Sequence, residues 1–313
     1  MVNTRAEAFA PATVANLGAG FDILGLAVEE PGDVVRAERR AEPGAVIVHI
    51  EGDNGRLPYE AGKNTACVAA GETLRLLGVR TGVTLTIYKH LPLASGLGSS
   101  AASAVAAAVA VNALYGAPLT YAELLPACVA GEAAVSGYHA DNVAPCLFGG
   151  ITLVTGTAAD QIYALPVPPG IVLALVTPDI TVPTAEARAV LPASVGLRQM
   201  VAQTAAVARL VDALHRQDIA ALAAAMEGDV VVEAARAHLI PCLAEARAAA
   251  KQAGALGVVI SGAGPTLCAV CDGEPAARAA GEAMQAVYKQ AGINSAARQT
   301  HIAAAGARVL QVL

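Results

Sequence analysis

A glycine-containing loop at residues 92–102 (PLASGLGSSAA) limits the possible folds of this chain more than any other segment. Before it, residues 83–89 (VTLTIYK) have the β-branched alternation of a strand, and after it an alanine-rich run predicts a helix from about Ser99 to Tyr115. Gly96 and Gly98 let the backbone turn several N–H groups toward one point, to which the helix adds its positive end. The sequence therefore predicts a loop that binds phosphate.

The segment 92–102 differs from two other known nucleotide-binding loops. A Walker A loop requires a Lys that this segment lacks, and neither GAG at 18–20 nor GAG at 262–264 has the third Gly of a dinucleotide fingerprint. The letters GSSAA at 98–102 approximate the nucleophile elbow of α/β hydrolases, with Ser100 as the nucleophile, although no HGGG-type oxyanion motif is present. The hydrolase alternative stays open, as does a glycine-rich turn that binds nothing.

Length and composition limit the class of protein. A chain of 313 residues is long enough for two domains, and 55% hydrophobic residues with 15% charged residues indicate a globular chain. A net charge of −6 argues against a nucleic-acid partner. The longest apolar run, residues 101–113, is too short and too rich in Ala to span a bilayer, and no secretion signal is recognised. Six Cys in apolar stretches are expected to be free thiols, so we expect a cytoplasmic protein without a membrane partner.

The order of the expected elements predicts an α+β fold. Strands are expected at 46–52, 83–89 and 147–155, and helices at 63–78, 99–115 and 121–136. A turn-rich segment at 166–170 (PVPPG) suggests a boundary near residue 160, which gives domains at 1–160 and 161–313. The second domain is expected to contain strands near 171, 257, 266 and 308, with helices at about 185–191, 197–216, 218–226, 229–237, 241–254 and 274–291. Such uneven mixing of strands and helices is typical of α+β rather than doubly wound proteins.

Three motifs lie in the order and spacing of one known family. PATVANLGAGFD at 11–22, the loop at 92–102 and SGAGPT at 261–266 together resemble the GHMP kinases, named for galactokinase, homoserine kinase, mevalonate kinase and phosphomevalonate kinase. Within that family, HADNVAP at 139–145 and TAEAR at 184–188 are similar to the homoserine kinase branch. The resemblance covers essentially the whole chain. It implies an N-terminal domain like the second domain of ribosomal protein S5, a ferredoxin-like C-terminal domain and an active site between them.

The resemblance also implies which residues bind ATP and Mg²⁺. The Ser100 hydroxyl and the Glu132 carboxylate would bind the Mg²⁺, a hard cation that takes oxygen ligands and keeps several waters. The residues expected at ATP are Asn64, Lys89, Pro92, Leu93, Ala94, Ser95, Gly96, Leu97, Gly98, Ser99, Ser100, Ala101 and Ala102. Taken without the family, Glu132 is a solvated helix residue, Asn64 is a helix cap and Lys89 is an exposed strand lysine.

The acceptor that the resemblance implies is L-homoserine, a zwitterion. Its carboxylate suits the guanidinium forks of Arg188 and Arg236, and its ammonium suits carboxylate and amide oxygens. The residues expected at this substrate are Asn16, Asp22, His139, Asn142, Thr184, Arg188 and Arg236. Taken alone, each Arg is a solvent-facing charge on an alanine-rich helix, and a lone His is usually structural.

The implied reaction transfers the γ-phosphate of ATP to the L-homoserine hydroxyl and gives O-phospho-L-homoserine, which leads to threonine. Several GHMP kinases place an Asp as general base where this chain has Asn142, and an amide cannot accept the proton as a carboxylate would. We therefore expect direct attack by the hydroxyl, with Asn142, Ser100 and Glu132 as the catalytic residues. The alternatives are another GHMP kinase, such as a mevalonate kinase, and a non-catalytic relative that binds a sugar or nucleotide. A homodimer is expected from the family alone.

Overall fold

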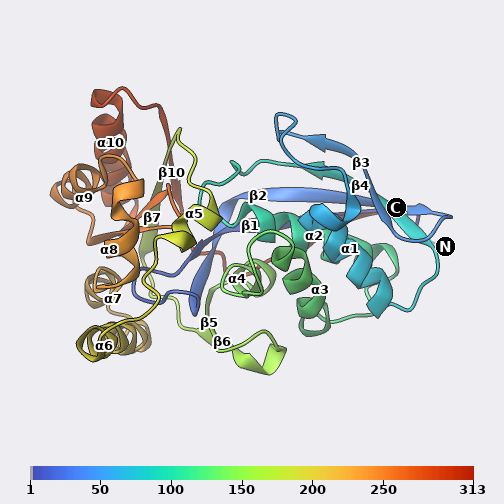
Figure 1. Ribbon diagram of the computed structural model, residues 1–313, viewed down its shortest axis with the longest axis horizontal. Coiled ribbons are helices and arrows are strands. Elements are labelled where there is room, and N and C mark those ends of the chain that lie inside the picture. Colours follow the sequence, from blue (N-terminus) through green and yellow to red (C-terminus); the bar gives the residue numbers. More distant parts are fainter. Residues whose placement is uncertain (1–2) are drawn as a thin grey trace.

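The computed structural model describes residues 3–313, which form two sheets with their helices (Figure 1). The larger sheet has seven strands: β1 (Arg5–Ala15), β2 (Leu24–Arg40), β3 (Ala45–Glu51), β4 (Gly82–Tyr88), β5 (Ile151–Val154), β6 (Ile162–Leu165) and β11 (Arg308–Val312). Its order is β11-β1-β2-β4-β3, with β5 paired to β2 and β6 paired to β5. Only the pair of β3 with β4 is parallel among these described strands.

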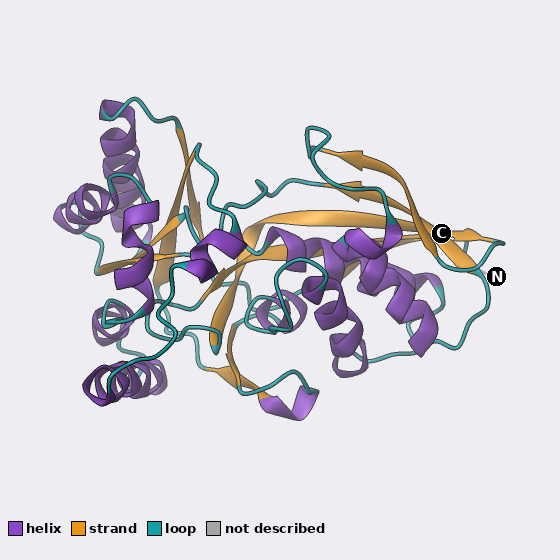
Figure 2. Ribbon diagram, in the orientation of Figure 1, coloured by secondary structure: helices purple, strands orange, loops and turns teal. Residues whose placement is uncertain are grey.

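Helices cover one face of the larger sheet (Figure 2). They are α1 (Thr65–Leu76), α2 (Ser99–Leu114), α3 (Tyr121–Ala133) and α4 (Val143–Phe148), with a short 3₁₀ helix, η1 (Ala61–Lys63), before α1. Every residue of α2 from 101 to 114 is buried, because its alanines let the helix lie close against β1 and β2. No helix within residues 3–313 has both the length and the hydrophobicity needed to cross a membrane.

The smaller sheet confirms the expected ferredoxin-like domain. Its strands are β7 (Ile171–Pro178), β8 (Gly257–Ile260), β9 (Leu267–Asp272) and β10 (Ser295–Thr300), in the antiparallel order β10-β7-β9-β8. Between β7 and β8 the chain forms α5 (Thr184–Ala189), α6 (Leu197–His215), α7 (Ile219–Met226), α8 (Val232–Arg236), η3 (Ala237–Leu239) and α9 (Leu243–Gln252). α10 (Glu274–Gln290) joins β9 to β10 and packs against α9. The fold is therefore α+β, as predicted.

The strand pairing differs from the expected division of the chain in two places. The boundary placed near residue 160 falls in η2 (Ala159–Gln161), and the larger sheet continues through β6 to Leu165. The final strand, expected in the C-terminal domain, returns instead to the larger sheet, where Val312 of β11 pairs with Ala6 of β1. The helix α4 also takes the beginning of the segment 147–155 that was expected to be a strand. The two-domain division stays a prediction, but strand pairing favours a boundary after Leu165.

Candidate active site

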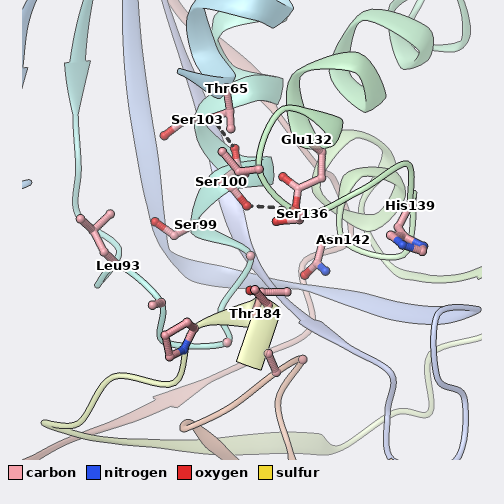
Figure 3. A pocket seen from close by; sticks show the side chains of 18 of the residues that line it. Thr65, Leu93, Ser99, Ser100, Ser103, Glu132, Ser136, His139, Asn142 and Thr184 are labelled. Atoms are coloured by element: carbon pink, nitrogen blue, oxygen red, sulfur yellow. Dashed lines mark hydrogen bonds between the residues drawn. The ribbon is translucent and has the colours of Figure 1, made fainter. Parts of the chain in front are cut away.

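A cavity of about 420 Å³ is lined by residues from distant parts of the chain (Figure 3). Its wall comes from the phosphate loop, from the beginning of α2, from the end of α3 and from α5 of the other domain. The expected site residues that line it are Asn16, Asp22, Asn64, Lys89, Leu93, Ala94, Gly96, Gly98, Ser99, Ser100, Glu132, His139, Asn142, Thr184, Arg188 and Arg236. The remaining ones, Pro92, Ser95, Leu97, Ala101 and Ala102, belong to the same loop and helix but do not line the cavity. The fold thus brings residues from both domains to one cavity.

The phosphate loop is held in a conformation that requires its glycines. Gly98 is the residue before α2, with a left-handed φ of 64°, and a Cβ there would lie 2.0 Å from Thr13 Oγ1. Gly96 has a φ of 81°, and its Cβ would lie 2.2 Å from the Ser261 carbonyl oxygen, so the SGAGPT turn packs directly on the loop. The first N–H groups of α2 have no partner within the helix, so its positive end faces the cavity. This geometry suits a phosphate group.

Lys89 supports this loop from beneath instead of lying exposed on its strand. The side chain is buried, and its ammonium forms an ion pair with Asp33 of β2. It also donates to the Ser99 carbonyl and to Ser103 Oγ, both at 2.8 Å. Asp33 accepts in turn from the backbone N–H groups of His90 and Leu91. With its three donors engaged, Lys89 holds the end of the loop at Ser99, while Asp33 holds its start, and Lys89 has no donor left for a nucleotide.

Asn64 has the local role that its sequence position alone suggested. Its Oδ1 accepts from the Ala66 N–H at 3.1 Å, which caps α1, and its Nδ2 donates to the Pro58 carbonyl at 3.0 Å. The residue lines the cavity as well. The cap therefore fixes the start of α1 at the wall of the cavity.

Ser100 and Glu132 form a pair suited to a cation. Ser100 Oγ donates to Glu132 Oε1 at 3.0 Å, and Figure 3 shows the two side chains pointing toward one another. The other oxygen, Glu132 Oε2, is buried and has no hydrogen-bond partner among the described residues. Burial raises the pKa of this carboxyl, which hydrogen bonds from Ser100 and Ser136 lower only in part. A hydrolase would need a histidine beside Ser100, whereas the structure places a carboxylate there.

Arg188 and Asp22 form an ion pair on the opposite side of the cavity. The Arg188 Nη atoms donate to the two oxygens of Asp22 at 2.8 and 3.2 Å. His139 Nδ1 lies 3.6 Å from Asp22 Oδ2. This cluster offers a cation and an anion side by side, which matches the two charges of a free amino acid.

Arg236 is a buried cation without a carboxylate. Only 3% of the residue is exposed, and its guanidinium donates to two backbone carbonyls, Ala187 at 2.9 Å and Gly262 at 3.1 Å. No carboxylate in the described chain lies within ion-pair distance of it. Burial and the charge of Arg188 lower the pKa of Arg236. A buried, unpaired guanidinium that lines a cavity favours an anionic ligand.

Asn16 and Asn142 are both fixed by hydrogen bonds. Asn16 Nδ2 donates to the Gly262 carbonyl at 2.9 Å, and its Oδ1 accepts from the Asp22 N–H, so it joins the first motif to the third. Asn142 Oδ1 accepts from the Thr13 hydroxyl at 2.7 Å. Asn142 therefore keeps its N–H groups for a ligand, whereas both polar atoms of Asn16 are engaged.

Two residues of this site were not singled out from the sequence. Phe21 places its ring beneath both arginines, with the Arg188 and Arg236 guanidinium carbons 5.5 and 5.1 Å from the ring centre. Asp141 is buried and lines the cavity, and burial, with the charges of Asp22 and Glu132, raises its pKa to about 7. Both lie inside motifs that the sequence analysis quoted, so the motifs could have indicated them. The sequence did not show that their side chains point into the site.

The raised pKa of Asp141 predicts a pH-dependent stability. The folded chain keeps the proton up to about pH 7, whereas the unfolded carboxyl loses it near the ordinary value of 3.8. The stabilisation is therefore complete below the unfolded pKa and is lost as the pH rises through the folded one. Between about pH 5 and 6, Asp141→Asn, which stays neutral, should gain roughly 1.3 kcal/mol in free energy of unfolding relative to the wild type, and the gain should level off above about pH 7. Denaturant unfolding without ligands measures this gap; a constant gap would contradict the buried carboxyl.

Comparison with known proteins places this geometry in context. Residues 64–150 match the family model for the N-terminal domain of GHMP kinases, and residues 210–290 match the model for their C-terminal region. The chain is 41% identical over 291 residues to the homoserine kinase of Chlorobium phaeovibrioides (90% of this chain, 91% of that one), and 42% identical over 311 residues to that of Arabidopsis thaliana (97% and 84%). The crystal structure of homoserine kinase from Cytophaga hutchinsonii is similar with a TM-score of 0.94 at 40% identity, covering 99% and 98% of the chains. A mevalonate kinase from L. major shares the fold, with a TM-score of 0.73 at 19% identity over 97% and 98%.

Proposed function

The chain belongs to the GHMP kinase family, and on this premise we propose that it is an ATP-dependent homoserine kinase. It transfers the γ-phosphate of ATP to the side-chain hydroxyl of L-homoserine and releases O-phospho-L-homoserine and ADP, a step of threonine biosynthesis. The buried Arg236 guanidinium is the observation that supports this acceptor most directly. Beside the Asp22–Arg188 pair it adds a cation that the protein leaves unmatched, and an amino acid carboxylate matches it.

The two ends of the substrate meet complementary groups. The carboxylate faces Arg188 and Arg236, and the ammonium faces Asp22, with the buried Asp141 nearby. Binding exchanges the internal Asp22–Arg188 pair for a pair of the ammonium with Asp22 and a contact of the carboxylate with both arginines, so each charged group has a partner of opposite sign. This arrangement explains how the cavity accepts a zwitterion.

The phosphate loop and the Ser100–Glu132 pair form the nucleotide side. Backbone N–H groups at the start of α2 bind the phosphates, while Lys89 and Asp33 hold the loop in place. Glu132 Oε2, buried and without a partner in the described chain, fits a Mg²⁺ ligand, and Ser100 Oγ fits a second one. When bound, Mg²⁺ neutralises phosphate charge.

Catalysis then consists mainly of positioning and charge stabilisation. The homoserine hydroxyl oxygen forms a bond to the γ-phosphorus, and the bond from that phosphorus to the oxygen of ADP breaks. The hydroxyl proton passes to phosphate or solvent, because the neutral amide of Asn142 cannot act as a base as a carboxylate would. Such a loose transition state needs little covalent help from the protein.

ADP release tests the proposal. Purified protein with ATP and Mg²⁺ should release ADP with L-homoserine and not with mevalonate or galactose. Activity with mevalonate alone would make it another GHMP kinase, and ATP binding without turnover on any acceptor would make it a non-catalytic relative. The homodimer, the cytoplasmic location and the lack of nucleic-acid and membrane partners stay predictions.

A further inference from the structure

Thr13 of β1 lies between the nucleotide side and the acceptor side of the site. It is fully buried, its backbone N–H donates to the Leu97 carbonyl of the phosphate loop at 3.1 Å, and its hydroxyl donates to Asn142 Oδ1 at 2.7 Å. One residue therefore contacts both the loop that binds phosphate and the amide that faces the acceptor.

The Thr13 hydrogen bond determines which atoms Asn142 presents to a ligand. A hydroxyl has a single hydrogen, and with the amide turned the other way that hydrogen would have no acceptor in a buried place. The bond to Asn142 Oδ1 is the only side-chain hydrogen bond recorded for Thr13 in the described structure. The amide oxygen is thus occupied, and the two N–H donors of Nδ2 face the cavity.

The phosphate loop holds this pair in place. A Cβ on Gly98 would lie 2.0 Å from Thr13 Oγ1 and 2.9 Å from Asn142 Oδ1, so the loop backbone closes over both oxygens. Rotation of either side chain toward the loop is blocked. The position of the Asn142 amide is consequently tied to the position of the loop itself.

We propose that Thr13 is a positioning residue. Its hydroxyl fixes the Asn142 amide so that the amide N–H donors face the acceptor hydroxyl and the transferred group, and its backbone ties this amide to the phosphate loop. This inference rests on the proposed function. Asn142 then serves as a hydrogen-bond donor that orients the acceptor hydroxyl and stabilises charge developing on the transferred group. The proton of the hydroxyl leaves by another route, because a neutral amide is not a base.

Thr13→Val tests this role, since valine keeps the shape and removes the hydroxyl. Turnover with L-homoserine should fall about tenfold, as expected for a misplaced donor, while ATP binding measured by calorimetry stays unchanged. Thr13→Ser should recover most of the rate. Thr73→Val is the matched control, because Thr73 is also buried and donates to Ala69 within α1, outside the cavity.

A double-mutant cycle separates positioning from ordinary stability. On an Asn142→Ala background, Thr13→Val should change turnover by less than about twofold, because the amide that it positions is gone. An equal tenfold loss on both backgrounds, or a loss matched by Thr73→Val, would assign Thr13 a structural role and overturn the inference. If Thr13→Val does not fold, Thr13→Ala, which is smaller, replaces it in the cycle. An inactive wild type would refute the proposed function, whereas an active wild type with an equally active Thr13→Val refutes only the role of Thr13.

Discussion

Glu132→Gln is expected to lower turnover at least about 100-fold and to weaken ATP binding far less, because the substitution removes the charge that neutralises a bound cation. The carboxylate is buried, and burial raises its pKa, so its negative charge destabilises the ligand-free protein. The neutral amide should therefore raise the thermal midpoint of the ligand-free protein while activity falls. Loss of activity with a gain in stability cannot result from misfolding.

The matched control for Glu132 lies on the same helix. Glu123 is exposed and completes the capping box of α3 with Thr120, a role that Gln can also fill. Glu123→Gln should leave both turnover and the Mg²⁺ concentration for half-maximal rate unchanged, whereas Glu132→Gln should change both. Turnover of Glu132→Gln within twofold of the wild type would remove Glu132 from the metal site.

Local patterns in the sequence predicted much of this fold correctly. The phosphate loop and α2 were predicted because glycines, a helix start and an alanine-rich run are contiguous in the chain. β4 was predicted from the β-branched alternation of its sequence, although the structure buries most of its residues. β10 was missed, because its segment SAARQT is largely exposed and has no apolar alternation.

Contacts between residues far apart in the chain could not be predicted from the sequence. The pairing of β11 with β1 joins the two ends of the chain, and only complementary edges of a formed sheet determine it. The ion pair of Lys89 with Asp33 joins residues 56 positions apart, so the sequence could not show it: the resemblance placed Lys89 at ATP, and taken alone it was an exposed strand lysine. Thr13 and Asn142 lie 129 positions apart, so the motifs that contain them could not indicate the hydrogen bond between them.

The site residues show the same limit. The family resemblance gave Arg188 and Arg236 the same role, and the structure distinguishes them, since Arg188 is paired with Asp22 and Arg236 has no carboxylate partner in the described chain. An alanine-rich helix predicts an exposed arginine at each position, whereas in the structure both arginines line the cavity. Replacement of Arg236 therefore breaks no ion pair within the described residues, whereas replacement of Arg188 does.

Arg236→Leu is expected to raise the KM for L-homoserine about 10- to 150-fold, which corresponds to the roughly 1.5–3 kcal/mol of a charge-assisted hydrogen bond. The KM for ATP should change little, because Arg236 lies with Phe21 on the acceptor side. Arg188→Leu should have a more complex effect, since it also leaves Asp22 without its partner. Arg198→Leu, at an exposed position of α6, is the control for a lost helix arginine.

Homoserine amide shows whether the arginines recognise the carboxylate. The amide keeps the ammonium and the hydroxyl but lacks the negative charge, so the wild type should use it much less well than the acid. In Arg236→Leu this preference, expressed as a ratio of kcat/KM values, should shrink by about tenfold or more, because the cation that distinguishes the two compounds is gone. Arg198→Leu should keep the full preference. If Arg236→Leu also keeps it, the carboxylate binds elsewhere and the buried guanidinium serves only to join the Ala187 and Gly262 carbonyls.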